Sequence, residues 1–193
     1  MGMSRRDLFR GMWQRGRTVA GDLSRAMHTD HTLVVLQRPP GAVAEGQFLA
    51  SCTRCLDCVA ACPPQAIRVA DDTFGPSRSG TPYIDASLQA CVMCTDLPCI
   101  EACGPGVLHA DLPVAMADVT INEGGCLSWQ GERCRLCSDA CPVEGAIQLD
   151  PGDRPRIDPA ICTGCGSCLQ ACPVGTEGVN FSPAQARPFH ALD

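Results

Sequence analysis

The residues with the clearest chemistry in this chain are its 16 cysteines, which fall into four groups of four. The first and fourth groups share the pattern Cys-x2-Cys-x2-Cys-x3-Cys-Pro, while the second is stretched before its third cysteine and the third after its first. The groups are Cys52, Cys55, Cys58 and Cys62; Cys91, Cys94, Cys99 and Cys103; Cys126, Cys134, Cys137 and Cys141; and Cys162, Cys165, Cys168 and Cys172.

Cysteines grouped this tightly indicate bound metal rather than a disulfide framework, whose cysteines are scattered. A loop with two-residue gaps brings three thiolates to adjacent iron atoms of a cubane cluster, and the fourth comes from elsewhere in the chain. Zinc is the alternative, but a zinc site needs only two Cys-x2-Cys pairs and a spacer. The sequence therefore predicts four [4Fe–4S] clusters with all 16 cysteines as iron ligands.

The predicted chemistry is electron transfer. Because four complete ligand sets use every cysteine, no iron is left open for a substrate. The serines, histidines and carboxylates fall in no recognisable nucleophilic or acid–base motif. We therefore expect an electron-transfer protein or subunit and not an enzyme with its own substrate site.

Short extended segments flank the cysteine groups. Residues 83–85, 119–121 and 156–158 precede groups, and residues 66–69, 106–108 and 145–149 follow them. In bacterial ferredoxins the last cysteine opens a short helix, whose first position suits the following proline. Each unit is thus predicted as strand, cysteine loop, one-turn helix and strand. We expect an α+β fold of two ferredoxin-like dicluster modules with a pseudo-twofold relation and little regular secondary structure.

Two pairings of the groups are open. Sequential pairing joins the first group with the second and the third with the fourth. Nested pairing joins the second with the third, inside the first with the fourth. The separations of 28, 22 and 20 residues between groups permit both.

Composition bears on the class of partner. The formal net charge is −6. Residues 1–38 carry seven Arg and three Asp, so the negative charge lies in the rest of the chain. Nucleic acid is therefore not an expected partner. The best apolar run, residues 33–36, is four residues long and too short to span a membrane. A redox protein partner is expected instead.

Residues 38–181 resemble the ferredoxin-type proteins of the Nap and Mau systems, especially the NapG/MauM group. The resemblance rests on Arg-Pro-Pro-Gly-Ala at 38–42, Gly-Thr-Pro-Tyr at 80–83, Asp-Leu-Pro-Cys at 96–99 and Gln-Gly at 130–131. That group is similar to the iron–sulfur subunits of molybdoenzymes related to dimethyl sulfoxide reductase, in which pairing is nested. The resemblance therefore favours the nested arrangement.

The resemblance implies four ligand sets and a division of the chain. The sets are Cys52, Cys55 and Cys58 with Cys172; Cys162, Cys165 and Cys168 with Cys62; Cys91, Cys94 and Cys99 with Cys141; and Cys126, Cys134 and Cys137 with Cys103. The expected division is a basic extension at 1–45, a four-cluster body at 46–185 with an 80–150 module nested within 46–79 and 151–185, and a tail at 186–193. The implied donor is a quinol-oxidising membrane protein or a soluble reductant, and the implied acceptor is a molybdoenzyme or another oxidoreductase.

The N-terminal segment departs from the NapG pattern. Residues 4–9 look like half of a twin-arginine signal, but charged residues interrupt 10–25, where such a signal needs an apolar stretch. The segment resembles the N-terminus of NapF-like cytoplasmic proteins. We therefore expect a cytoplasmic location, with membrane association only through a partner; the alternative is periplasmic, by twin-arginine export. A helix over 5–27 would serve for docking, and a disordered basic tail is the alternative.

The NapF-like start also raises a second function, a cytoplasmic maturation factor that assists iron–sulfur cluster loading of a molybdoenzyme. Trp129 is a separate open question. It lies in the long gap between Cys126 and Cys134, where it is expected either to shield a cluster from water or to pack the loop.

Overall fold

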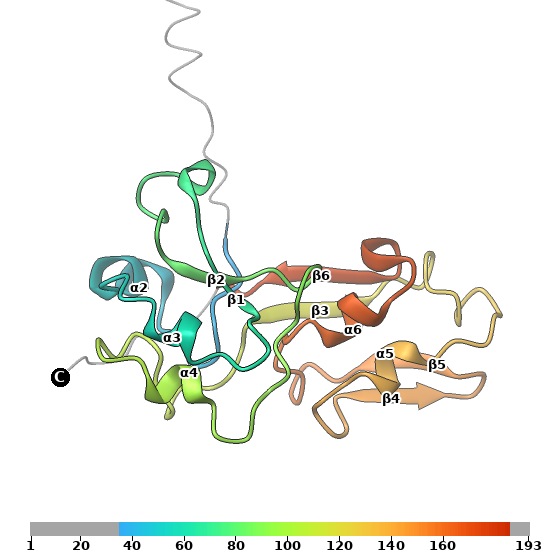
Figure 1. The fold of residues 1–193 in the computed structure, drawn as a ribbon. Coiled ribbons are helices and arrows are strands. Elements are labelled where there is room, and N and C mark those ends of the chain that lie inside the picture. The colour runs from blue at the N-terminus through green and yellow to red at the C-terminus, as the bar shows by residue number, and fades with distance from the viewer. Residues whose placement is uncertain (1–34, 186–193) are drawn as a thin grey trace, which may run out of the picture. The chain divides into compact units, whose positions relative to one another are not determined.

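The computed structural model describes residues 35–185, where the chain forms short helices and strands (Figure 1). The helices are α2 (Glu45–Ser51), α3 (Asp57–Ala60), α4 (Pro98–Glu101), α5 (Leu136–Asp139) and α6 (Ser167–Ala171), with 3-10 turns η1 (Asp72–Phe74) and η2 (Gly175–Glu177). The strands are β1 (Ile67–Val69), β2 (Pro82–Ile84), β3 (Ala117–Ile121), β4 (Ile147–Asp150), β5 (Arg154–Ile157) and β6 (Val179–Pro183). This small mixed content agrees with the predicted α+β class. Within residues 35–185, the structure has no helix with the length and apolar character to cross a bilayer.

The strands form three two-stranded antiparallel sheets (Figure 1). β1 with β2 and β4 with β5 join strands close in the chain, whereas β3 and β6 pair across the last two cysteine groups, with Ala117 opposite Pro183. An isolated bridge between Ala42 and Leu108 pairs the segments on either side of the first two groups in the same way. We call residues 36–112 the first half and residues 113–185 the second half; each has an outer pairing and an inner strand pair.

Two hydrophobic cores lie beneath these sheets. Phe48, Leu108 and Met116 are central to the first core, and Leu169 and Val179 to the second. Each core also contains buried cysteines. Because the chain has only five Phe, two Trp and one Tyr, the cysteine loops fill interior space that aromatic side chains occupy in most domains.

The prediction that the last cysteine of each group opens a helix is wrong. The third cysteine lies within the short helix: Cys58 in α3, Cys99 in α4, Cys137 in α5 and Cys168 in α6. The last cysteine follows the helix, and Cys172 caps the C-terminus of α6. The physical reason is that proline cannot continue a helix, so the Cys-Pro pair of the first, third and fourth groups marks the helix end; in the second group Gly104 separates Cys103 from Pro105.

The folded body begins earlier than the predicted boundary at residue 46. Gln37, Arg38 and Val43 are buried, and Gln37 forms a β-bridge with Ile84. Residues 35–45 therefore belong to the body, so the prediction of an extension reaching residue 45 is wrong for this stretch. The predicted docking helix at 5–27 and the tail at 186–193 lie outside the described residues.

Candidate iron–sulfur sites

Four cavities in the described part of the chain are each lined by four cysteines. In every case three cysteines come from one group and the fourth is the last cysteine of another. The sets are Cys52, Cys55 and Cys58 with Cys103; Cys91, Cys94 and Cys99 with Cys62; Cys126, Cys134 and Cys137 with Cys172; and Cys162, Cys165 and Cys168 with Cys141. All 16 cysteines are used, each once.

This grouping is sequential, so the nested sets implied by the resemblance are wrong. Cys172 lines the cavity of the third group instead of the first, and Cys103 lines that of the first group instead of the third. The physical reason lies in the strand pairing: β3 with β6 closes the third and fourth groups into one half. The Ala42–Leu108 bridge closes the first and second groups into the other. The expected 80–150 module nested within 46–79 and 151–185 fails for the same reason.

The cysteine set fits a [4Fe–4S] cluster. The four cavities have similar empty volumes of about 350, 320, 310 and 300 Å³. Their other lining residues are mostly proline and aliphatic side chains, and such apolar surroundings control solvent access to a metal centre. Within residues 35–185, no three or more His, Cys, Asp or Glu side chains converge on one point as ligands of a single ion do. The sulfurs of each set surround a cavity instead.

Burial raises the pKa of eight of the thiols that line these cavities, because a thiolate loses its hydration there. Burial, followed by the nearby cysteines Cys103, Cys52 and Cys55, raises the pKa of Cys58 to about 12. Burial likewise raises the pKa of Cys99 and Cys168 to about 12, and of Cys91 and Cys137 to about 11. These five thiols are therefore protonated at neutral pH, and binding iron would release their protons.

Left-handed residues turn the chain sharply in three of the four loops. In each of these loops two positions have positive φ: one residue before the second cysteine and two residues before the third cysteine. These residues are Arg54 and Leu56 in the first loop, Met93 and Leu97 in the second, and Gly164 and Gly166 in the fourth. The sharp turns let three sulfurs of one short loop face a single cavity.

The third loop takes a different path. Arg135, two residues before Cys137, has a φ of −139°, and the loop is enlarged by the longer gap after Cys126. In that gap the Trp129 ring stacks with the guanidinium groups of Arg154 and Arg156, which lie 5.2 and 5.4 Å from its centre. The Trp129 indole N–H donates to the Pro155 carbonyl oxygen at 3.3 Å. Trp129 thus packs the enlarged loop against β5 and is not among the residues lining the cavity.

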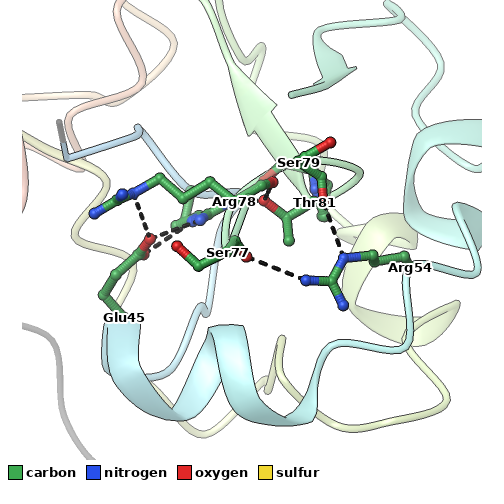
Figure 2. Close-up of polar contacts among 8 residues, drawn as sticks. Glu45, Arg54, Ser77, Arg78, Ser79 and Thr81 are labelled. Carbon is green, nitrogen blue, oxygen red and sulfur yellow. Dashed lines mark hydrogen bonds and ion pairs between the residues drawn. The ribbon is translucent and has the colours of Figure 1, made fainter. Parts of the chain in front are cut away.

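The first cysteine loop is fastened from outside by Arg54 (Figure 2). The Arg54 guanidinium donates to the carbonyl oxygens of Ser79, at 2.9 Å, and Ser77, at 3.1 Å. Both acceptors lie in the connection between β1 and β2. Arg54 therefore joins an otherwise exposed cysteine loop to the neighbouring strand pair.

A buried ion pair anchors the elements beside this loop. Arg38 is fully buried and donates to both carboxylate oxygens of Glu45, at 2.6 and 2.9 Å, and to the Thr81 hydroxyl at 2.9 Å. Its guanidinium also lies 4.5 Å from the centre of the Phe48 ring. Figure 2 shows Arg78 reaching the same carboxylate, 3.9 Å away. Because a buried charge needs its partners, Arg38 fixes α2 against the segment before β2.

Sequence reasoning missed the residues other than cysteine that position the loops. Arg38 gave no signal of its buried position, because a charged side chain is usually exposed. Gln37 gave no signal, although its buried amide donates to the Gly164 carbonyl oxygen at 3.0 Å. The two glycines of the fourth loop were the signal that could have been used, because glycine tolerates positive φ and close contacts.

Comparison with known families supports the cluster type. A family model described as "4Fe-4S dicluster domain" matches residues 51–107 and 132–176. The first match spans the first two cysteine groups, and the second spans most of the last two. The gap between the matches, residues 108–131, covers the connection between the second and third groups and also includes Cys126.

Curated relatives match most of the chain. The methylamine utilization ferredoxin-type protein MauM of Methylorubrum extorquens is 38% identical over 162 residues, covering 77% of this chain and 73% of the relative. The ferredoxin-type protein NapG of Escherichia coli is 35% identical over 163 residues, covering 76% and 70%. The ferredoxin-type protein NapF of Escherichia coli is 30% identical over 141 residues, covering 71% and 80%. No solved structure matches the chain. The chain therefore belongs to the ferredoxin-type iron–sulfur proteins of the NapG/MauM group, which carry 4Fe-4S dicluster domains.

Proposed function

We propose that this protein carries four [4Fe–4S] clusters and relays electrons between a donor and an oxidoreductase. The observation that carries the proposal is the set of four cavities of similar volume, each lined by four thiols and together using all 16 cysteines. When bound, the clusters supply one-electron chemistry, and the protein sets their potentials by burial and by hydrogen bonds to sulfur. One such hydrogen bond is the Ala66 N–H donating to the Cys62 sulfur at 3.3 Å.

The ligand sets we propose are the four sequential sets that line the cavities. They make each half of the described body one dicluster module, with two clusters exchanging their fourth cysteine. A pseudo-twofold relation within each module is part of this proposal. It is supported by the outer pairing and inner strand pair that each half contains.

The partner we propose is a redox protein: a quinol-oxidising membrane protein or a soluble reductant as donor, and a molybdoenzyme or other oxidoreductase as acceptor. Since every cysteine is assigned to a ligand set, we propose no substrate site on the protein itself. The comparisons do not favour the alternative of a maturation factor, because the relatives named MauM and NapG are more similar to this chain than the one named NapF.

We also propose a cytoplasmic location, because charged residues interrupt 10–25 where a twin-arginine signal needs an apolar stretch. Fractionation of cells that express the C-terminally tagged chain tests this proposal. Recovery in the cytoplasmic or membrane fraction at full length supports it. Recovery in the periplasm supports export.

The function is tested by anaerobic purification of the tagged protein from its own host. About sixteen iron atoms and sixteen acid-labile sulfides per chain are expected, from four ligand sets with four irons each. A redox titration followed by electron paramagnetic resonance (EPR) should show reversible one-electron reduction. Zinc without sulfide would contradict the proposal. A stoichiometric redox protein in the preparation would identify the partner, whereas a substoichiometric, cofactor-poor oxidoreductase would support maturation instead.

A further inference from the structure

The two halves meet where the second and fourth cysteine loops touch. The Cys91 backbone N–H donates to the Cys165 carbonyl oxygen at 3.2 Å. The Ser167 hydroxyl donates to the Cys91 carbonyl oxygen at 3.3 Å and lies 3.6 Å from the Cys165 sulfur. Two cysteines from different ligand sets are therefore joined by one direct hydrogen bond and through one serine.

Two glutamine side chains hold the same contact from either side. Gln37 of the first half donates to the Gly164 carbonyl oxygen at 3.0 Å, next to Cys165. Gln170 of α6 accepts from the Ala90 backbone N–H at 3.2 Å and donates to the Leu88 carbonyl oxygen at 3.1 Å. Leu88 and Ala90 immediately precede the second cysteine group, so the contact is fixed along both loops.

The packing at this contact leaves no room for an additional methyl group. A Cβ built on Gly166 would lie 2.2 Å from the Cβ of Ala86. Ala86 belongs to the first half but packs in the core of the second, and Cys165 belongs to the second half but packs in the core of the first. The halves interlock here, so the distance between the two cysteine loops is fixed.

Inside each half the neighbouring ligand sets also touch. Helix α3, which holds Cys58, contacts α4, which holds Cys99. Helix α5, which holds Cys137, contacts α6, which holds Cys168. These contacts, with that between the two halves, place the four sets in the order first, second, fourth, third.

The solvent exposure of its residues indicates that the first ligand set lies at one end of the series of four. Cys55 is the one exposed cysteine of the sixteen, and the adjacent Leu56 is also exposed. In contrast, Cys165 and both of its flanking glycines are buried. At the other end, Leu136 lines the cavity of the third set and is 49% exposed.

We propose that electrons cross between the two halves at the Cys91–Cys165 contact, so that redox partners exchange electrons with the outer sets, Cys52/Cys55/Cys58/Cys103 and Cys126/Cys134/Cys137/Cys172. This inference rests on the proposed function. In each transfer one centre is oxidised by one electron and its neighbour is reduced by one, with no bond broken and no proton moved. The electrons enter from a reduced donor protein at one outer set and leave to an oxidised acceptor protein at the other.

Two matched cysteine variants of the full chain test the order. Cys94→Ala removes the second set, which is interior, and Cys55→Ala removes the first set, which is an end. Each should lose one cluster's iron. In the fully reduced protein, EPR of Cys94→Ala should show one magnetically isolated cluster beside an interacting pair. Cys55→Ala should show three interacting clusters. An isolated spectrum in Cys55→Ala, or none in Cys94→Ala, would overturn the order.

A second pair of variants keeps every cysteine. Ala86→Val should push the Gly166 loop away and weaken the magnetic interaction between the halves while all the iron is retained. Ala70→Val changes an equally buried alanine of the first half whose N–H bonds to Thr81, away from the contact, and should leave the interaction unchanged. Equal spectra in both variants would overturn the proposal. A wild-type chain without cluster iron would refute the proposed function as well, whereas a wild-type chain with full iron and the wrong pattern would refute only the order.

Discussion

The first and fourth cysteine loops have the same spacing and the same left-handed turns, yet they lie in opposite surroundings. The first has Arg54 and Leu56 at the two positive-φ positions and is largely exposed. The fourth has Gly164 and Gly166 there and is buried. Cysteine spacing thus determines how a loop presents its sulfurs, while the residues between the cysteines determine what the loop can touch.

Glycine suits the fourth loop for two reasons: its backbone has positive φ there, and neighbouring atoms leave no space for a side chain. A Cβ on Gly164 would lie 2.2 Å from the Ala117 backbone nitrogen, and one on Gly166 would lie 2.2 Å from the Ala86 Cβ. In the first loop the side chains have room, and the stem of Arg54 packs beside Gly80. Glycine in a cysteine loop therefore indicates a loop packed against other elements.

Gly166→Ala should have the largest effect of the changes that test this comparison. The added methyl group meets Ala86, and alanine at a φ of 90° is strained. Overpacking of about 1–3 kcal/mol and strain of similar size should together lower the stability substantially. Anaerobic thermal unfolding measures the loss, with Gly75→Ala as the control, since Gly75 also has positive φ but no neighbour within 4 Å. Equal losses of stability in the two variants would mean that glycine is required because of backbone strain alone, and not because of contact with Ala86.

Arg54→Ala should have an intermediate effect. It removes the two hydrogen bonds to Ser77 and Ser79, at an exposed site, and should cost roughly 0.5–1 kcal/mol. Amide hydrogen exchange in the connection between β1 and β2 should become faster. The control is Arg68→Ala, an exposed arginine on β1. Unchanged exchange in Arg54→Ala would show that the observed hydrogen bonds do not hold the first loop.

Leu56→Gly should have the smallest effect. Glycine relieves the left-handed strain at a φ of 67° but adds unfolded-state entropy of about 0.5–1 kcal/mol, so the two nearly cancel. Denaturant unfolding under anaerobic conditions should give a midpoint close to that of the wild type. A large destabilisation would mean that Leu56 packs over its cavity more tightly than its exposure indicates.

Much of the site could be predicted from cysteine spacing alone. The four groups and the α+β class follow from local pattern, and the expected strands at 83–85, 119–121 and 156–158 overlap β2, β3 and β5. Local pattern succeeds here because three sulfurs of one loop are set by the turns between neighbouring cysteines.

The pairing of the groups could not be predicted, because it depends on contacts between distant segments. Separations of 28, 22 and 20 residues fit either arrangement, and the outcome depends on which strands pair. β3 and β6 enclose the last two groups, which leaves Cys172 with the third loop. The resemblance to nested iron–sulfur subunits favoured the wrong arrangement because the related cysteine motifs fit both.

The most direct test of the sequential ligand sets is the iron content of two double variants of the full chain. Cys55 and Cys103 line one cavity, so Cys55→Ala/Cys103→Ala should lose only about four of sixteen irons, the same as either single variant. Cys55 and Cys172 line different cavities, so Cys55→Ala/Cys172→Ala should lose about eight. The reverse result, about eight lost in the first variant and about four in the second, would contradict the sequential sets and restore the nested ones.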